Sequence, residues 1–188
     1  MPRRALAILL CAAFAAACSS TSDGDDPAEP ASLTADLFPL VERTARFSLG
    51  RGKVATLHVF PREEAMADMS FDGARGVAQQ FRVMRTDDAL FLAAGPGRGT
   101  EILRFGELPG KAWESGMEII QFEGWERVQV PAGTFDAAKI TTRSGPDQLP
   151  RLQTWWFAPG EGLVRLRSNY GTIFQEEMQL LGAGAVVK

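Results

Sequence analysis

The chain has 188 residues, with 20 basic and 23 acidic side chains and a formal net charge of −3 at neutral pH. This balance argues against the basic surface on which nucleic acids bind. With two cysteines and one histidine, the sequence also lacks the residues for a disulfide framework or for the usual zinc sites.

The first seventeen residues are typical of a secretory signal. Arg3 and Arg4 form a short basic stretch, and residues 5–17 are apolar and uncharged. About 13 apolar residues are too few for a transmembrane helix, which needs roughly 20. We therefore expect residues 1–17, with Cys11, to be removed on export. Because two arginines leave with them, the mature chain has 20 − 2 = 18 basic and 23 acidic side chains, a net charge of −5.

The end of this segment resembles the bacterial lipobox. Three alanines, residues 15–17, precede Cys18, and two serines follow it. The resemblance implies that the sulfur of Cys18 carries a diacyl lipid and that Cys18 becomes the new N-terminus. Two acyl chains make such attachment durable where one would be marginal. The lipobox most often has Leu where Ala15 stands, so the alternative is plain secretion with Cys18 as a free thiol.

The residue after Cys18 bears on localisation. It is Ser19 and not Asp, and an Asp at this position resembles an inner-membrane retention signal of proteobacterial lipoproteins. We therefore expect the protein at the outer membrane, facing the periplasm. Residues 18–32 form the acylated N-terminus and an acidic linker rich in Ser, Asp and Pro, whose composition is typical of a flexible tether.

Residues 33–188 are expected to form a single β domain. Short segments rich in Val, Ile, Thr, Phe and Trp alternate with Gly and Pro, which predicts sequential strands. Val77, Phe81 and Val83 share one face while polar neighbours share the other, and such half-buried strands favour an antiparallel sheet. The expected strands are residues 44–49, 54–60, 77–85, 89–94, 100–105, 118–122, 126–130, 135–142, 151–157, 163–168 and 174–181. One short helix is expected at residues 62–69, where Pro61 and two glutamates suit a helix start.

Two stretches resemble an uncharacterised family of exported bacterial proteins and lipoproteins. They are residues 128–137, VQVPAGTFDA, and residues 155–164, WWFAPGEGLV, and the opening LFPL at residues 37–40 adds to the resemblance. The resemblance implies a curved antiparallel sheet or incomplete β-barrel, and no established chemistry. Both motifs read as turns, because Pro presets one turn position and Gly permits a left-handed one.

The residues for catalysis are few. His58 is the only histidine, and its strand pattern predicts a position on the sheet surface. Adjacent carboxylate pairs occur at 63–64, 87–88 and 176–177, with a wider pair at Glu114 and Glu118; neighbours on one strand point to opposite faces, so none is nominated. We expect no catalytic residue, no metal site and no cofactor.

The aromatic residues are the least ordinary feature of the sequence. Trp155 and Trp156 are adjacent in one expected strand and must point to opposite sides of the sheet. If the sheet curls into an open barrel like those of lipoprotein carriers, its concave face can admit an acyl chain. Trp156, Trp125 and Phe157 are the hypothetical ligand-binding residues. The competing interpretation is that the tryptophans build the core.

These features are interpreted as those of an envelope lipoprotein with a non-catalytic β domain. The domain is expected to be a binding or scaffold module for a partner protein or an apolar ligand, with its lipid as the membrane contact and no nucleic acid as partner. Two alternatives remain open: a cell-wall-directed hydrolase that uses paired carboxylates, and a structural subunit of an envelope complex.

The lipid anchor has a direct test. In the Cys18→Ser variant, the sulfur that would accept the diacyl group is absent. The mass of the mature protein should lose the acyl increment, and the protein should move from the membrane fraction to the soluble fraction. A variant that keeps both the increment and the membrane association would contradict the lipobox interpretation.

Overall fold

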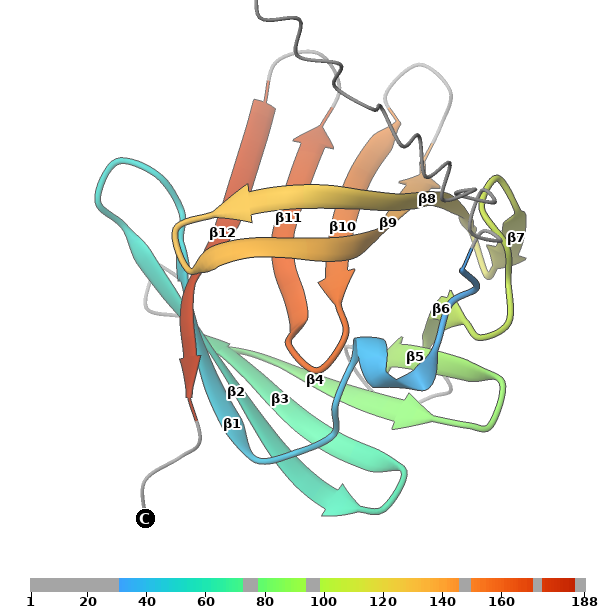
Figure 1. Cartoon of the computed structure of the whole chain (residues 1–188), viewed down its shortest axis with the longest axis horizontal. Helices are drawn as coiled ribbons and strands as arrows, with labels where there is room; N and C mark the ends of the chain where they lie inside the picture. Colours follow the sequence, from blue (N-terminus) through green and yellow to red (C-terminus); the bar gives the residue numbers. More distant parts are fainter. Residues whose placement is uncertain (1–30, 73–77, 94–98, 146–149, 171–173, 185–188) are drawn as a thin grey trace, which may run out of the picture.

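The computed structural model describes residues 31–72, 78–93, 99–145, 150–170 and 174–184 (Figure 1). Within these ranges a single 3-10 helix, η1 (Ala35–Leu37), precedes the strands. The strands are β1 (Arg43–Ser48), β2 (Val54–Glu63), β3 (Met66–Asp72), β4 (Ala78–Arg85), β5 (Ala89–Ala93), β6 (Thr100–Arg104), β7 (Ala112–Ser115), β8 (Glu118–Val130), β9 (Gly133–Ser144), β10 (Arg151–Ala158), β11 (Gly162–Tyr170) and β12 (Phe174–Gly184). None of the described helices is long and apolar enough to cross a membrane.

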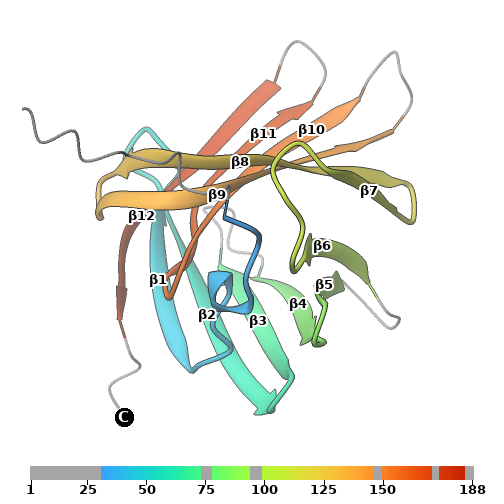
Figure 2. The ribbon, with the colours of Figure 1, turned by 45° about the vertical axis from the view of Figure 1, so that its right-hand side comes forward.

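The strands form one antiparallel sheet in the order β6-β5-β4-β3-β2-β1-β12-β11-β10-β9-β8-β7. Two meanders, β1–β6 and β7–β12, are therefore joined by the pairing of β1 with β12, in which Thr44 lies opposite Gly184. The sheet curls until its two edge strands come close, as Figures 1 and 2 show. The prediction of an all-β domain with a curved antiparallel sheet or incomplete barrel is confirmed.

Side chains hold the seam between the edge strands β6 and β7. The backbone N–H of Glu101 donates to Ser115 Oγ at 2.7 Å, and Trp113 Nε1 donates to the Glu101 carbonyl at 3.3 Å. The Arg104 guanidinium lies over the Trp113 ring at 5.4 Å. The sheet edges, which would otherwise expose unpaired backbone groups, thus face each other.

The alternation of apolar residues explains why these segments are strands. In β1 and β2, Ala45 and Phe47 lie opposite Leu57 and Ala55, and all four are buried. The residues between them are polar and more exposed, as a half-buried antiparallel strand requires. We call the face that carries these residues the core face of the sheet.

A segment that precedes β1 completes the core. Leu33, Leu37 and Phe38 are 1%, 0% and 4% exposed, and the Phe38 ring packs edge-to-face on Phe157 with centroids 6.3 Å apart. The Gly160 N–H donates to the Asp36 carbonyl at 2.9 Å, which ties the segment to the β10–β11 turn. We call residues 31–38 the N-terminal plug, because they fill the inside of the curled sheet.

The expected helix at residues 62–69 is wrong. The stretch belongs to the β2–β3 hairpin, with Met69 opposite Val59 and Asp68 opposite Phe60. Pro61 falls at a register shift of the hairpin, a position where a sheet tolerates proline. Residues 66–69 alternate between partly buried and buried positions, as in a strand. The residues around Pro61 and Glu63 that suggested a helix start form a bulge and a turn instead.

Two further strands differ from expectation. β7 (Ala112–Ser115) was not expected, and the strands expected at 118–122 and 126–130 are one strand, β8, with a bulge between Phe122 and Gly124. Gly124 has φ = +134°, which explains how a glycine interrupts the alternation without ending the strand.

Both motif stretches form turns, as predicted. The hairpin between β8 and β9 closes with Val130 opposite Gly133. In the second motif, Gly160 and Gly162 have φ = +74° and +71°. A Cβ at Gly162 would collide with the guanidinium of Arg43, so this glycine makes room for a buried arginine.

The plug predicts a large loss of stability when it is truncated. Leu37→Ala should lower the free energy of unfolding by about 3 kcal/mol, because a buried leucine leaves both a transfer cost and a cavity. Met117 is 93% exposed, so Met117→Ala should change the free energy of unfolding by less than about 0.5 kcal/mol. Urea unfolding followed by tryptophan fluorescence measures both, and equal effects would show that the plug adds nothing to the core.

Candidate functional site

Trp155 and Trp156 point to opposite sides of the sheet, as predicted. Trp155 lies opposite Ile140 and stacks on Phe157 with ring centroids 6.2 Å apart, on the core face. Trp156 lies opposite Lys139 on the other side, which we call the Trp156 face. Trp155 is partly buried against the core, and Trp156 is only 3% exposed.

Charged side chains from β8, β9 and β11 cover Trp156. Its indole N–H donates to Glu126 Oε1, and Glu126 Oε2 also pairs with Lys139 Nζ at 3.5 Å. The guanidinium carbons of Arg165 and Arg167 lie 4.9 and 6.0 Å from its ring centroid. Such cation–π contacts strengthen when they are shielded from water, so Trp156 holds a charged layer together.

Arg165 and Arg167 share one carboxylate, that of Glu177 on β12. Arg165 Nε donates to Glu177 Oε1 at 2.6 Å, and Arg167 Nη2 lies 3.7 Å from the same oxygen. Burial alone would raise the pKa of Glu177, but hydrogen bonds from Gln179 and Arg165 and the charge of both arginines outweigh it and lower that pKa. The ionised carboxylate is therefore part of the folded state.

Trp125 and Phe157 lie on the core face and not with Trp156. Both are register partners of Ala138, Trp125 from β8 and Phe157 from β10. Phe157 is 1% exposed and packs on Phe38 of the plug, while Trp125 is half-buried and donates from Nε1 to the Ala31 carbonyl at 2.6 Å. The structure thus brings two of the three hypothetical ligand-binding residues together and places the third on the opposite face.

His58 lies on the sheet surface, where its strand pattern placed it. Its Nδ1 is 3.2 Å from Thr44 Oγ1, and its Nε2 is 3.7 Å from Asp72 Oδ2. Thr44, His58 and Asp72 supply the same three groups as the catalytic triad of a hydrolase: a hydroxyl, an imidazole and a carboxylate. The resemblance is limited to these groups. Thr44 sits inside β1, paired on both sides with β2 and β12. Its neighbouring backbone N–H groups therefore belong to the sheet and are not arranged as an oxyanion hole requires.

The paired carboxylates are spread over turns and strand surfaces. Glu63 ends β2, and Glu64 follows in the β2–β3 turn. Asp87 and Asp88 lie in the β4–β5 turn. Glu114 and Glu118 are in β7 and β8, and Glu176 and Glu177 are neighbours in β12. No group of three or more His, Cys, Asp or Glu side chains that could hold a metal ion occurs within the described residues.

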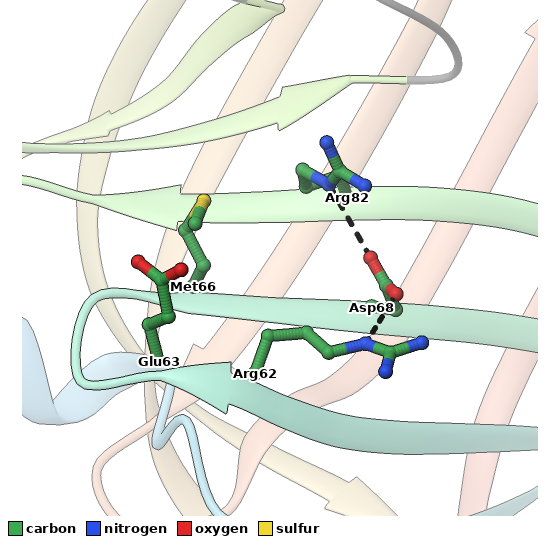
Figure 3. A pocket seen from close by; sticks show the side chains of 5 residues that line it. All are labelled: Arg62, Glu63, Met66, Asp68 and Arg82. Carbon is green, nitrogen blue, oxygen red and sulfur yellow. Dashed lines mark hydrogen bonds and ion pairs between the residues drawn. The ribbon is translucent and has the colours of Figure 1, made fainter.

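A shallow hollow of about 400 Å³ lies on β2, β3 and β4 (Figure 3). Asp68 stands between two arginines there, with Arg62 Nε at 2.7 Å and Arg82 Nε at 3.3 Å from its oxygens. The hydrogen bond from Arg62 lowers the pKa of Asp68, with a smaller contribution from Arg82. Both arginines are mostly exposed, so the hollow is a solvated ion-pair surface of the kind that contributes little to stability.

A buried arginine and an exposed apolar stripe were not predicted from the sequence. Arg43 is 7% exposed, donates to the Glu161 carbonyl at 2.5 Å and lies over the Phe38 ring at 5.5 Å, and burial lowers its pKa while Glu161 partly offsets this. No local sequence signal marks a buried arginine in a strand. The second feature is an apolar stripe of Met117, Ile119 and Leu152. The two adjacent isoleucines at 119–120 could have indicated it, because neighbours on a strand point to opposite faces.

The apolar stripe lies at one end of the Trp156 face. Ile119 and Leu152 are 50% and 41% exposed, and both are opposite Arg143 in register, one on each side of it. Met117 adds a nearly fully exposed side chain at the adjoining β7–β8 turn. Three of the seven large hydrophobic side chains that are exposed among the described residues thus lie on β8, on β10 and in the β7–β8 turn, with β9 between the two strands.

Comparison with known proteins gives a likeness of fold. No protein-family model matches the chain, and neither does any curated protein. The crystal structure of a candidate exported protein with a YmcC-like fold from Bacteroides fragilis NCTC 9343 is similar, with a TM-score of 0.52 and 14% identity over 78% of this chain and 98% of that one. A candidate lipoprotein from Parabacteroides distasonis ATCC 8503 has a TM-score of 0.48 and 19% identity over 79% of this chain and 98% of that one.

The charged layer on Trp156 predicts a loss of stability in acid. Because the folded-state pKa of Glu177 is lowered, its contribution is present above the unfolded pKa and is lost as pH falls through the folded pKa. Glu177→Gln should therefore lower stability at pH 7 and flatten its decline between about pH 5 and pH 3. The exposed neighbour Glu176 supplies the matched control, Glu176→Gln, which should leave the pH profile of urea unfolding unchanged; identical profiles for both variants would refute the assignment.

Proposed function

We propose that the chain is an exported bacterial lipoprotein whose β domain is a non-catalytic scaffold that binds a partner protein. The observation that carries the proposal is the apolar stripe of Met117, Ile119 and Leu152. Apolar side chains that gather on a folded surface mark recognition sites, whereas scattered ones need no explanation. Lipidation at Cys18 and a place at the outer membrane, facing the periplasm, belong to the same proposal.

The filled core supports a surface-binding role over an internal ligand. The plug contributes Leu33, Leu37 and Phe38 to the space that an acyl chain would take in an open barrel, and all three are buried. Phe157, one of the hypothetical ligand-binding residues, packs against the plug. A ligand at this position would have to displace part of the chain's own core.

The composition of the stripe fits a protein partner. Interfaces are enriched in Met and Arg. The stripe contains Met117, and Arg143 lies between Ile119 and Leu152. The exported-protein candidate from Bacteroides fragilis, which is similar in fold, is compatible with an envelope location. If the partner protein is bound permanently, the chain is a structural subunit of an envelope complex, and the same surface would form the contact.

Site-specific cross-linking tests the proposal. A photo-reactive amino acid at position 117 should give one cross-linked species of defined mass in intact envelopes of the source bacterium. The matched control is position 54, because Val54 is 39% exposed and lies in β2, six strand positions from β8 in the twelve-strand order. The double variant Ile119→Glu and Leu152→Glu should remove the species without changing the circular dichroism spectrum.

Two results would overturn the proposal. One is the absence of any cross-linked species at position 117, or an equal yield at position 54. The other is a species that survives the double variant while the domain stays folded. If the cross-linked species survives extraction and appears in native mass spectrometry at one copy per chain, the partner is a permanent one.

A further inference from the structure

The tether enters the domain at a defined place. Trp125 donates from Nε1 to the Ala31 carbonyl at 2.6 Å, and Leu33 exchanges backbone hydrogen bonds with Gly106 and Glu107, at 2.8 and 3.0 Å. Residues 31–33 are thus fixed to β8 and to the β6–β7 loop. The chain that precedes them leaves the domain at this point.

The loop that follows Glu107 lies against the same part of β8. The Gly110 N–H donates to the Phe122 carbonyl at 2.7 Å, and a Cβ at Gly124 would be 3.6 Å from Pro109. Leu108, at the start of this loop, is 46% exposed although it is apolar. Leu108 and Trp125 therefore flank the entry point of the tether from two sides.

Basic side chains accompany these two residues. Lys111, in the same loop, is exposed, and so is Arg127, two residues after Trp125 on β8. Among the nearby acids, Glu107 lies 3.8 Å from Arg104, and Glu123 accepts a hydrogen bond from Thr141 at 2.8 Å. Asp136 on β9 lies opposite Arg127 in register. We call Leu108, Lys111, Trp125 and Arg127 the entry rim.

The number of residues between Cys18 and the domain limits how far the entry rim can lie from the membrane. Residues 19–30 are twelve residues, which reach at most about 40 Å even when fully extended. A domain of about 150 residues has a radius of gyration near 15 Å and is therefore about 40 Å across. The entry rim of an anchored chain therefore stays within about one domain diameter of the bilayer, whereas the opposite side can lie twice as far away.

We infer that the entry rim docks onto the lipid surface to which Cys18 is anchored. This inference rests on the proposed lipid anchor. Trp and Leu with neighbouring Lys and Arg are the residues that settle at a bilayer interface, where the ring and the aliphatic chain enter the headgroup layer and the cations meet lipid phosphates. Four such side chains are too few to bind a membrane alone, but the tether supplies a high effective concentration of lipid.

Spin labels on the acylated full chain test the docking. The only mature cysteine is Cys18, and its sulfur is occupied by lipid, so a Leu108→Cys variant has a single free thiol. In vesicles of phosphatidylethanolamine and phosphatidylglycerol at 3:1, a label at position 108 should collide several-fold more often with oxygen, relative to a water-soluble nickel chelate, than a label in Phe60→Cys. Phe60 is 42% exposed and lies in β2, on the far side of the strand order from β8.

A charge reversal provides the second measurement. Lys111→Glu should reduce the lipid exposure of the label at 108 several-fold, because it removes a phosphate contact and adds repulsion from the anionic lipid. Lys53→Glu, at an exposed residue before β2, is the matched control and should have no effect.

Each remaining outcome is informative. A chain that carries no acyl mass and does not float with vesicles overturns the proposed anchor, and the docking with it. An acylated chain whose labels at 108 and 60 are equally accessible to nickel overturns the docking alone. A label at 108 that is shielded from both oxygen and nickel places protein on the rim, which also overturns it.

Discussion

The burial of the N-terminal plug is the constraint on which the rest of the structure depends. Leu33, Leu37 and Phe38 are buried and belong to the same hydrophobic core as the apolar side chains of the sheet. Burial of each such side chain contributes about 1.5–3 kcal/mol. In the same segment, Leu33 hydrogen-bonds to the β6–β7 loop and Asp36 to the β10–β11 turn. The plug therefore completes the core inside the curled sheet and ties residues 33 and 36 to two loops that are far apart in the sequence.

Most of the architecture could be predicted from the sequence, because strands and turns have local sequence patterns. Period-2 alternation and turn residues located ten of the twelve strands, including the hairpin at Pro131 and the turn at Gly160. The errors came where two local signals competed. Around Pro61 and Glu63, helix-start residues occupied a bulged hairpin. The strand β3 in this hairpin pairs with β2 and also with β4, which lies outside that local window.

The candidate site was harder to predict because its members meet only across strands. Trp155 and Trp156 were placed on opposite faces from adjacency alone, which is a local property. Trp156 is surrounded by side chains from neighbouring strands: Arg165, Arg167, Glu126 and Lys139. Their meeting depends on the register of four strands, and the sequence of one strand does not determine that register. The plug was missed for the same reason, since LFPL at residues 37–40 gives no indication that its side chains fill a barrel.

The two edge strands that form the seam, β6 and β7, are consecutive in the chain, and this has a consequence for folding. Ten of the eleven strand pairings join sequence neighbours and can form as local hairpins, whereas Thr44 and Gly184 of the β1–β12 pairing are 184 − 44 = 140 residues apart. Closing that loop costs roughly 2 kcal/mol more entropy than closing a ten-residue one. Each half of the domain can thus be assembled from local hairpins, and only the arrival of the last strand joins the two halves.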